Sequence, residues 1–397
     1  MFRFSKMTDE LRSSDIRNLM SLAINPDIIS FSGGMPGNDL FPLKEVDAIY
    51  NNLSESKKQA AFQYGPTPGY PPLLESLKEF LRKKGLPVDE NQLIITTGSL
   101  QAINILAKVF VDPGDEVITE NPCFIGTISV LKSYGANING LAIDNEGIGI
   151  DLLKGALNNP VKPKFLYLTP YFHNPAGIVY SESRKQAVID ILKGKEIPLI
   201  EDDAYGDLYF YNEDIPRVKP FKAINPQGVN VCYTGSFSKI LGPGLRLGWM
   251  LVPEEVYVQA ELCKQAFDAC SPTFTQVIAD EFIRNGAIYS YISRLRIEYK
   301  KQAMAMVKAL KENLPDYVQW TEPRGGFYIW LKLPEGADSS EIFKESIKKG
   351  AIFVTGKTFD PAGKRNNFIR LSYSSTPIEK IQKGIPIVTD AIRKICG

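Results

Sequence analysis

Hydrophobic residues along this chain fall into two alternating patterns. Short apolar runs bounded by glycine, proline or polar residues predict buried strands, whereas apolar residues repeated every three to four positions predict helices. Strand patterns lie at 93–97, 115–119, 165–169, 199–202, 229–233 and 247–252. Helical patterns lie between several of them, at 100–111, 122–134 and 182–193. This alternation predicts an α/β fold with a mostly parallel central sheet sandwiched by helices.

The last third of the chain has a different pattern. After Pro253 it turns helical, and one long helical pattern at 289–314 ends before Pro315. Strand and helix patterns then alternate, at 325–334, 339–348, 368–373 and 378–395. We therefore expect a smaller α+β domain at the C-terminal end.

The N-terminal segment predicts an amphipathic helix at 8–24 and then a short strand, broken by Gly33 and Gly34. A chain of 397 residues exceeds what one core usually holds, so we expect two domains. We place a large domain at 41–290 and a small domain at 291–397, with segment 1–40 contributing in part to the small domain.

Composition narrows the class of protein. The hydrophobic fraction of 44% is that of an ordinary globular chain, and a net charge of +1 gives no drive toward nucleic acid or anionic membranes. The first residues lack the apolar core of a secretion signal, and no apolar run approaches the ~20 residues of a membrane span. Five scattered cysteines and a single histidine, His173, argue against disulfides and metal sites. These features predict a cytoplasmic enzyme without a metal.

The stretch 235–249 carries the most specific chemistry. Lys239 follows an apolar strand pattern and precedes a Gly-Pro-Gly turn. Burial lowers the pKa of a lysine, and the neutral amine can form a Schiff base with an aldehyde. Ser236, Ser238 and Arg246 offer donors to phosphate oxygens beside it. An aldehyde with a phosphate suggests pyridoxal phosphate, whereas the plain alternative is a surface lysine in a loop rich in serine and glycine.

Polar residues follow two neighbouring strand patterns as well. Asn174 comes after the strand pattern at 165–169, and Asp202 and Tyr205 come at the end of the next one. Ligands of parallel sheets bind beyond the carboxyl ends of the strands, so we expect these side chains to converge with Lys239. Taken singly, they are also explained by a turn, a helix cap and a core residue.

Two further positions suit anions. The small-residue turn at Gly98 and Ser99 precedes a helix N-terminus, a place that favours phosphate, although serine is also a common cap. Arg370 stands in an apolar strand pattern, where an unpaired guanidinium is costly. Either a buried salt bridge or an anionic ligand would satisfy it.

Together these motifs resemble one family over nearly the whole chain. The most specific are Asn174-Pro175-x-Gly177, Asp202-x-Ala204-Tyr205, and Ser236-x-Ser238-Lys239 with Arg246. The chain resembles the fold-type I pyridoxal phosphate enzymes of the aspartate aminotransferase family, and is most similar to the branch with α-aminoadipate and kynurenine aminotransferases. The resemblance implies an aminotransferase with a ping-pong cycle between an amino acid and a 2-oxo acid such as 2-oxoglutarate.

The resemblance also implies a role for each matching residue. Lys239 would bind the cofactor aldehyde and move the substrate proton, Asp202 would pair with the pyridine nitrogen, and Tyr205 and Asn174 would hydrogen-bond the 3′-oxygen. Donors that hold the phosphate would come from Ser99, Leu100, Ser236, Ser238 and Arg246, and from Tyr64 of a neighbouring subunit in a homodimer. Phe124 would stack on the ring. Substrate would be bound by Arg370, Asn174, Gly34 and Arg17.

Some residues depart from the family pattern, and some alternatives stay open. Phe124 and Leu100 replace a common tyrosine and glutamine, and His173 receives no role. Arg17 would select glutamate or 2-aminoadipate by pairing with a distal carboxylate, or would be a solvated residue in an enzyme for aromatic or aliphatic substrates. A pyridoxal phosphate lyase, such as a C–S lyase, would use the same cofactor residues. A transcription regulator would need a winged-helix domain, for which we expect no room before the matching region.

Overall fold

The computed structural model describes residues 2–5, 19, 21–224 and 228–397. Its centre is an eight-stranded sheet with the order β2-β9-β8-β7-β6-β3-β4-β5. The strands are β2 (Gln92–Thr96), β3 (Glu116–Asn121), β4 (Asn137–Asp144), β5 (Gly147–Ile148), β6 (Leu166–Leu168), β7 (Leu199–Asp203), β8 (Val231–Ser236) and β9 (Gly248–Val252). Strands β8, β7, β6, β3 and β4 run parallel, whereas β9 is antiparallel to both β8 and β2. The predicted, mostly parallel α/β sheet is confirmed.

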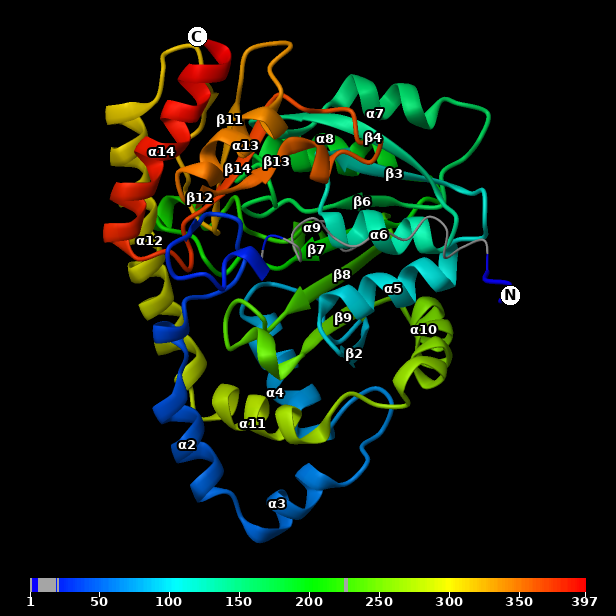
Figure 1. Cartoon of the computed structure of the whole chain (residues 1–397). Helices are drawn as coiled ribbons and strands as arrows, with labels where there is room; N and C mark the ends of the chain where they lie inside the picture. Colours follow the sequence, from blue (N-terminus) through cyan, green and yellow to red (C-terminus); the bar gives the residue numbers. More distant parts are fainter. Residues whose placement is uncertain (1, 6–18, 20, 225–227) are drawn as a thin grey trace.

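Helices cover both faces of this sheet (Figure 1). They are α4 (Pro71–Arg82), α5 (Ser99–Phe110), α6 (Ile125–Ser133), α7 (Ile150–Leu157), α8 (Glu182–Leu192), α9 (Phe221–Ile224), α10 (Glu254–Asp268) and α11 (Thr273–Arg284). Successive strand residues point to opposite faces. Thus Met250 packs in one core cluster with α5 and α10, whereas its neighbour Leu251 packs in another with α4 and α11.

A second, antiparallel sheet lies beside the first, with the order β10-β11-β14-β13. Its strands are β10 (Gln319–Trp320), β11 (Tyr328–Lys332), β13 (Val354–Thr355) and β14 (Phe368–Ser372). Three helices belong to this part of the molecule, α12 (Ala287–Asn313), α13 (Ser339–Lys348) and α14 (Ile378–Cys396), and α14 packs against both of the others.

The N-terminal segment is tied to this second part. Strand β1 (Ile29–Ser30) pairs in parallel with β12 (Ala351–Ile352), more than 300 residues away in sequence. Helices α2 (Leu43–Asn52) and α3 (Glu55–Phe62) then lead toward α11 at the lower end of the view in Figure 1. Most of the predicted helix at 8–24 lies outside the described residues.

Element boundaries differ from the prediction where turn geometry intervenes. The strand predicted at 325–334 is shorter, because Gly326 has a left-handed backbone with φ of +67° and the regular strand starts only at Tyr328. The prediction lacks strand β4, because its sequence mixes polar and apolar residues and is mostly half-exposed, although residues 137–142 pair with β3. A search for continuous apolar runs does not detect a strand of this mixed composition.

Candidate active site

One cavity of about 300 Å³ opens at the carboxyl ends of β6, β7 and β8. Its lining includes most of the residues expected in the site, namely Gly34, Ser99, Leu100, Phe124, Asn174, Asp202, Tyr205, Ser236, Ser238, Lys239, Arg246 and Arg370. Tyr64 lies outside it, 87% exposed, and Arg17 is outside the described residues. Of the residues that the structure describes, three cationic side chains and one carboxylate line the cavity, so its charge suits anionic ligands.

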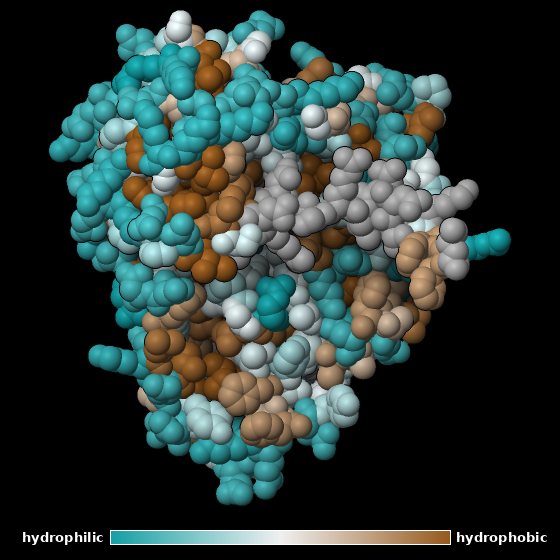
Figure 2. Space-filling model, viewed as in Figure 1, coloured by the Kyte–Doolittle hydropathy of each residue, from teal (hydrophilic) through white to brown (hydrophobic). Residues whose placement is uncertain are grey.

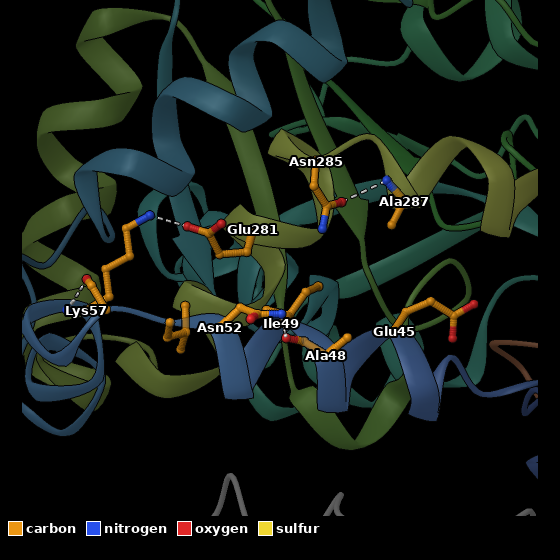
Figure 3. Close-up of a pocket in the computed structure, with 10 residues that line it drawn as sticks. Glu45, Ala48, Ile49, Asn52, Lys57, Glu281, Asn285 and Ala287 are labelled. Atoms are coloured by element: carbon orange, nitrogen blue, oxygen red, sulfur yellow. Dashed lines mark hydrogen bonds and ion pairs between the residues drawn. The ribbon is translucent and has the colours of Figure 1, made fainter.

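A wider hollow of about 490 Å³ lies elsewhere, between α2, α3 and α11 (Figure 3). The ion pair of Lys57 and Glu281 crosses it, with Asn52 and Asn285 also on its wall. None of the residues expected in the site lines it, so we place the chemistry in the smaller, more enclosed cavity.

Asp202 is the single carboxylate among the described residues that line the cavity. It lies on β7 and accepts hydrogen bonds from Tyr167 Oη at 2.7 Å and Thr234 Oγ1 at 3.0 Å. Burial outweighs these two bonds and raises the pKa of Asp202 to about 6. A cationic ring nitrogen beside this carboxylate would favour its charged form, so the position fits the pyridine nitrogen of pyridoxal phosphate.

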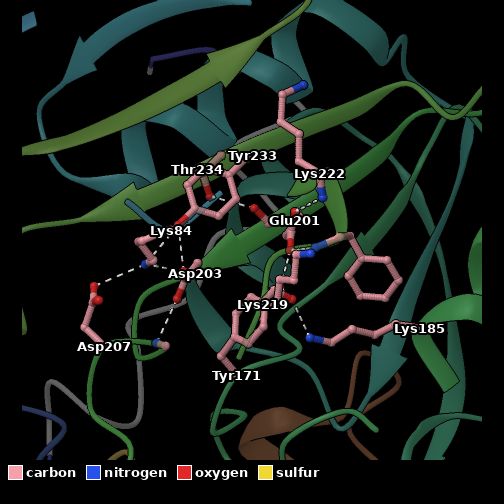
Figure 4. A network of polar contacts seen from close by, with 12 residues as sticks. Lys84, Tyr171, Lys185, Glu201, Asp203, Asp207, Lys219, Lys222, Tyr233 and Thr234 are labelled. Carbon is pink, nitrogen blue, oxygen red and sulfur yellow. Dashed lines mark hydrogen bonds and ion pairs between the residues drawn. The ribbon is translucent and has the colours of Figure 1, made fainter. Parts of the chain in front are cut away.

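The carboxylates on either side of Asp202 belong to a separate buried network (Figure 4). Asp203 accepts from Tyr233 Oη at 2.6 Å and from Lys84 Nζ at 3.0 Å. Glu201 accepts from the hydroxyl of Tyr171 and from the backbone N–H of Phe221. Because strand residues alternate in direction, these bonds fix the end of β7 while Asp202 stays directed to the cavity.

Lys239 lies three residues beyond the end of β8 and is half-buried. Its Nζ donates to the backbone oxygen of Gly34 at 2.6 Å, and it forms no ion pair within the described part of the chain. Burial, together with the positive charges of Arg370 and Arg246, lowers the pKa of Lys239 to about 8. A much larger share of this amine is therefore neutral and nucleophilic near neutral pH than in an exposed lysine.

Donors for a phosphate surround one end of the cavity. Helix α5 starts there without a capping side chain, beside Ser236, Ser238 and Arg246. Gly98 precedes the helix with φ of +81°, and a Cβ atom at this position would come within 2.7 Å of Arg246 Nη2. Free N–H groups at a helix N-terminus and a guanidinium together fit the phosphate group of pyridoxal phosphate.

Arg370 lies on β14 of the second sheet and reaches the same cavity. It is 1% exposed and donates through Nη1 to Asn174 Oδ1 at 2.8 Å and through Nη2 to the backbone oxygen of Ser32 at 2.6 Å. Its Nε is buried without a hydrogen-bond partner, and no described carboxylate pairs with it. Of the two explanations for a buried arginine, the anionic ligand is therefore the one that the geometry supports.

Sequence patterns did not identify one important member of the cavity. Tyr328, on β11, is buried against Tyr205, and their Oη atoms are 2.8 Å apart. Met35 and Thr169 line the cavity as well. Tyr328 stands two residues after the Gly325-Gly326 turn, and this local sequence does not indicate that its side chain lies in the cavity.

His173 lies behind the cavity and does not line it. Its Nδ1 accepts the backbone N–H of Ala176 at 3.1 Å, and its Nε2 is 3.3 Å from Glu120 Oε2. The imidazole thus braces the turn that carries Asn174, in keeping with its lack of an assigned role in the chemistry.

Comparison with known proteins identifies the family. The sequence model described as "Aminotransferase class I and II" matches residues 27–386. The chain therefore belongs to the class I and II aminotransferases. It is a transaminase that uses pyridoxal phosphate.

Relatives of this aminotransferase cover nearly its whole length. It is 34% identical over 396 residues to the "Aromatic-amino-acid aminotransferase 1" of Thermococcus litoralis, with 98% of this chain and 94% of the relative covered. It is 33% identical over 383 residues to the "2-aminoadipate transaminase" of Thermus thermophilus, with 96% and 94% covered. The crystal structure of the Pyrococcus horikoshii kynurenine aminotransferase, in complex with PMP, superposes with a TM-score of 0.94 at 34% identity over 98% of this chain and 97% of that one.

Within the part of the aminotransferase that the structure describes, we find no helix of the length and apolarity that a membrane crossing requires.

Proposed function

We propose that this aminotransferase moves an amino group from an α-amino acid to a 2-oxo acid such as 2-oxoglutarate in a ping-pong cycle. The observation that carries the proposal is the position of Lys239, a half-buried amine with no ion-pair partner among the described residues, in one cavity with Asp202 and Arg370. Bound pyridoxal phosphate supplies an aldehyde that takes up the amino group and a ring that accepts electrons from the substrate. The residues of the chain then have to hold the group, orient the substrate and move one proton.

Lys239 is the proposed base. With the cofactor and a substrate bound, its Nζ would accept the proton from the substrate Cα and donate it again on the cofactor side. Its pKa, lowered to about 8, suits a group that has to accept and release a proton near neutral pH. Asp202 keeps a proton on the ring nitrogen by its negative charge, and Tyr205 and Asn174 donate to the 3′-oxygen.

The cofactor's other contacts follow from the cavity wall. Backbone N–H groups of Ser99 and Leu100 hold the phosphate, with Ser236, Ser238 and Arg246. Phe124, at the start of α6, stacks on the ring without offering a hydroxyl. These assignments are supported by the fact that all of these residues line the same cavity.

Substrate binding uses the second sheet. Arg370 takes the α-carboxylate through its unpartnered Nε and its Nη atoms, beside Asn174 and the backbone of Gly34. Around this point the wall is largely apolar, with Met35, Leu100 and Tyr328. This lining supports aromatic or aliphatic side chains, and the named substrates of the relatives include an aromatic and a dicarboxylic class. Glutamate and 2-aminoadipate are accepted in addition if Arg17 pairs with their distal carboxylate.

We propose a homodimer in the cytoplasm. Tyr64 is far more exposed than an aromatic side chain usually is, and it follows α3, where Phe62 is also 78% exposed. Apolar side chains gather at the surface where α2, α3 and α11 lie (Figure 2). Contact of this face with a second copy would bury these rings and carry Tyr64 to the phosphate of the other subunit. The five free cysteines agree with a reducing compartment.

The test is a spectrum of the pyridoxal phosphate form during titration with one amino acid and no 2-oxo acid. An aminotransferase converts the cofactor to its amine, which bleaches the visible band and leaves a stoichiometric amount of 2-oxo acid. A lyase would keep the band and release ammonia or the side-chain fragment over many turnovers, and that result would refute the proposal.

Repeating the titration with a panel of amino acids, for wild type and Arg17→Ala, tests substrate choice. We expect the variant to lose about tenfold or more in kcat/KM for glutamate and 2-aminoadipate, the size of one charge-assisted hydrogen bond, and to keep phenylalanine and leucine. Equal loss for all substrates, or none, would remove Arg17 from substrate selection.

A further inference from the structure

Two phenol groups face each other inside the cavity. Tyr205 lies just beyond β7 of the large sheet, and Tyr328 lies on β11 of the second sheet. Their Oη atoms are 2.8 Å apart, and their rings meet edge to face with centroids 5.7 Å apart. Both residues line the cavity and both are buried. Among the described residues, neither hydroxyl has a hydrogen-bond partner other than the other phenol, so a ligand in the cavity is the remaining partner for the pair.

The position of Tyr328 is fixed on several sides. Arg370 lies over its ring, with Cζ 4.4 Å from the centroid. A Cβ atom on Gly34 would come within 2.4 Å of Tyr328 Oη, so the hydroxyl fills the space that the glycine leaves open. Strand pairing with β14 holds the backbone of Tyr328 opposite Ser372. The hydroxyl therefore has little freedom to move away from Tyr205.

The number of hydroxyl protons decides which of the two phenols donates the hydrogen bond between them. A phenol has a single proton to donate. Under the proposed function, the O–H of Tyr205 donates a hydrogen bond to the 3′-oxygen of the cofactor. Its oxygen is then left as an acceptor, and the short contact to Tyr328 requires Tyr328 to be the donor.

We propose that Tyr328 is a positioning residue whose hydroxyl donates to Tyr205 and thereby directs the only O–H of Tyr205 toward the cofactor's 3′-oxygen. This inference rests on the proposed function and adds to it a residue that acts through Tyr205. Hydrogen bonds in a chain polarise one another, so the donor strength of Tyr205 increases when its oxygen accepts from Tyr328.

The consequence is electrostatic. A stronger bond from Tyr205 would stabilise negative charge on the 3′-oxygen of bound pyridoxal phosphate, and would lower the pH at which the visible absorbance of the pyridoxal phosphate form titrates. The charged groups that face the two phenols are Lys239, 5.8 Å from the centroid of the Tyr205 ring, Arg370 over Tyr328, and Asp202. Replacing Tyr328 by phenylalanine keeps the ring under Arg370 and leaves all three charges in place.

The experiment is a pH titration of the visible absorbance of the pyridoxal phosphate form, for wild type and Tyr328→Phe. We expect the midpoint of Tyr328→Phe to be higher by about half to one pH unit, the shift that one hydrogen bond supplies. The dissociation constant for a substrate analogue with an α-carboxylate should stay within about twofold of wild type, because the ring under Arg370 remains.

Two further variants make the result specific. Tyr373→Phe removes another buried hydroxyl, which donates to the backbone oxygen of Gly325 at 2.9 Å and does not line the cavity, and it should leave the midpoint unchanged. Tyr205→Phe should raise the midpoint further than Tyr328→Phe. In the Tyr205→Phe background the second substitution should add nothing, because Tyr328 then has no phenol to act through.

An unshifted midpoint in Tyr328→Phe would overturn the proposal, as would an equal shift in the presence and absence of Tyr205. Wild-type protein without any titrating band would overturn the proposed function together with this inference. A titrating wild-type band with an unshifted variant would overturn the inference alone.

Discussion

Three successive carboxylates at the end of β7 show how position decides the role of a side chain. In the buried network, Glu201 accepts from a hydroxyl and a backbone N–H and Asp203 accepts from a hydroxyl and a lysine, whereas among the described residues Asp202 accepts only from the hydroxyls of Tyr167 and Thr234. Burial raises the pKa of Asp202 to about 6. The folded chain retains a carboxylate whose charge is costly until a cationic group arrives, which is the usual trade between stability and function.

The substitution Asp202→Asn should separate the contribution of this carboxylate to activity from its cost to stability. Activity should fall by about 100-fold or more, the size of losing a fixed electrostatic partner at the reacting centre.

In the protein without cofactor, the wild-type carboxyl has a folded pKa above its unfolded value of 3.8, so its contribution to stability is lost as pH rises through about 6.

We therefore expect the free energy of unfolding of Asp202→Asn, relative to wild type, to increase by roughly 1–2 kcal/mol between pH 5 and pH 8. Urea unfolding of both cofactor-free proteins across this range measures it. A difference in the free energy of unfolding that stays constant at all pH values would show that burial does not raise the pKa of Asp202.

At the scale of elements, three parallel strands and one helix build the cavity. Strands β6, β7 and β8 end at the same edge of the sheet, and α5 begins beside them. Gly98 allows this approach, because its backbone, with φ of +81° and ψ of 161°, is nearly restricted to glycine and because Arg246 leaves no room for a Cβ.

Gly98→Ala should weaken binding of pyridoxal phosphate by about tenfold or more, because the displaced Arg246 loses a charge-assisted bond to the phosphate. Gly286→Ala is a matched control. Gly286 shares the φ of +81° and precedes α12, although its ψ of −1° places it in the left-handed helical region, and a Cβ there meets nothing within 4 Å. Both variants should lose about 1–3 kcal/mol of stability from backbone strain, and only Gly98→Ala should lose cofactor affinity. Equal affinities, measured by fluorescence titration, would contradict the proposed phosphate site.

At the scale of the whole molecule, the site is assembled from distant parts of the chain. The large sheet supplies Lys239 and Asp202, the second sheet supplies Arg370 and Tyr328, and the N-terminal segment supplies Gly34. The pairing of β1 with β12 brings that segment to the second sheet. Movement between the two sheets would therefore change the distance between the carboxylate-binding arginine and the reacting lysine.

Subunit mixing tests the proposed dimer. Lys239→Ala should bind pyridoxal phosphate without turnover, and Tyr64→Ala should lose phosphate affinity in the partner's site. If Tyr64 acts across the interface, a hybrid dimer has one site with both lesions and one intact site. An equal mixture of the two variants, after subunit exchange, should then recover about a quarter of the wild-type sites. No recovery, with hybrid dimers shown by mass spectrometry, would place Tyr64 outside the neighbouring site.

The sequence by itself determined most strands of the central sheet, without β4 and β5, and most of the chemical groups of the site, without Tyr328. Apolar runs and the motifs around Asn174, Asp202 and Lys239 are local, so they can be read without knowing which strands are neighbours. The strand ends converge as expected because parallel strands share one edge. The division into domains at 1–40, 41–290 and 291–397 and the roles of single residues remain predictions.

Only the tertiary structure decided which distant residues meet. The contact between Tyr205 and Tyr328 joins positions 123 residues apart, and Arg370 reaches the backbone of Ser32 across 338 residues. Such contacts depend on how two sheets pack, and a local pattern holds no information about packing partners. The physical reason is that the burial which lowers the pKa of Lys239 and raises that of Asp202 arises where distant parts of the chain, including Tyr328 and Arg370 of the second sheet, meet around one cavity.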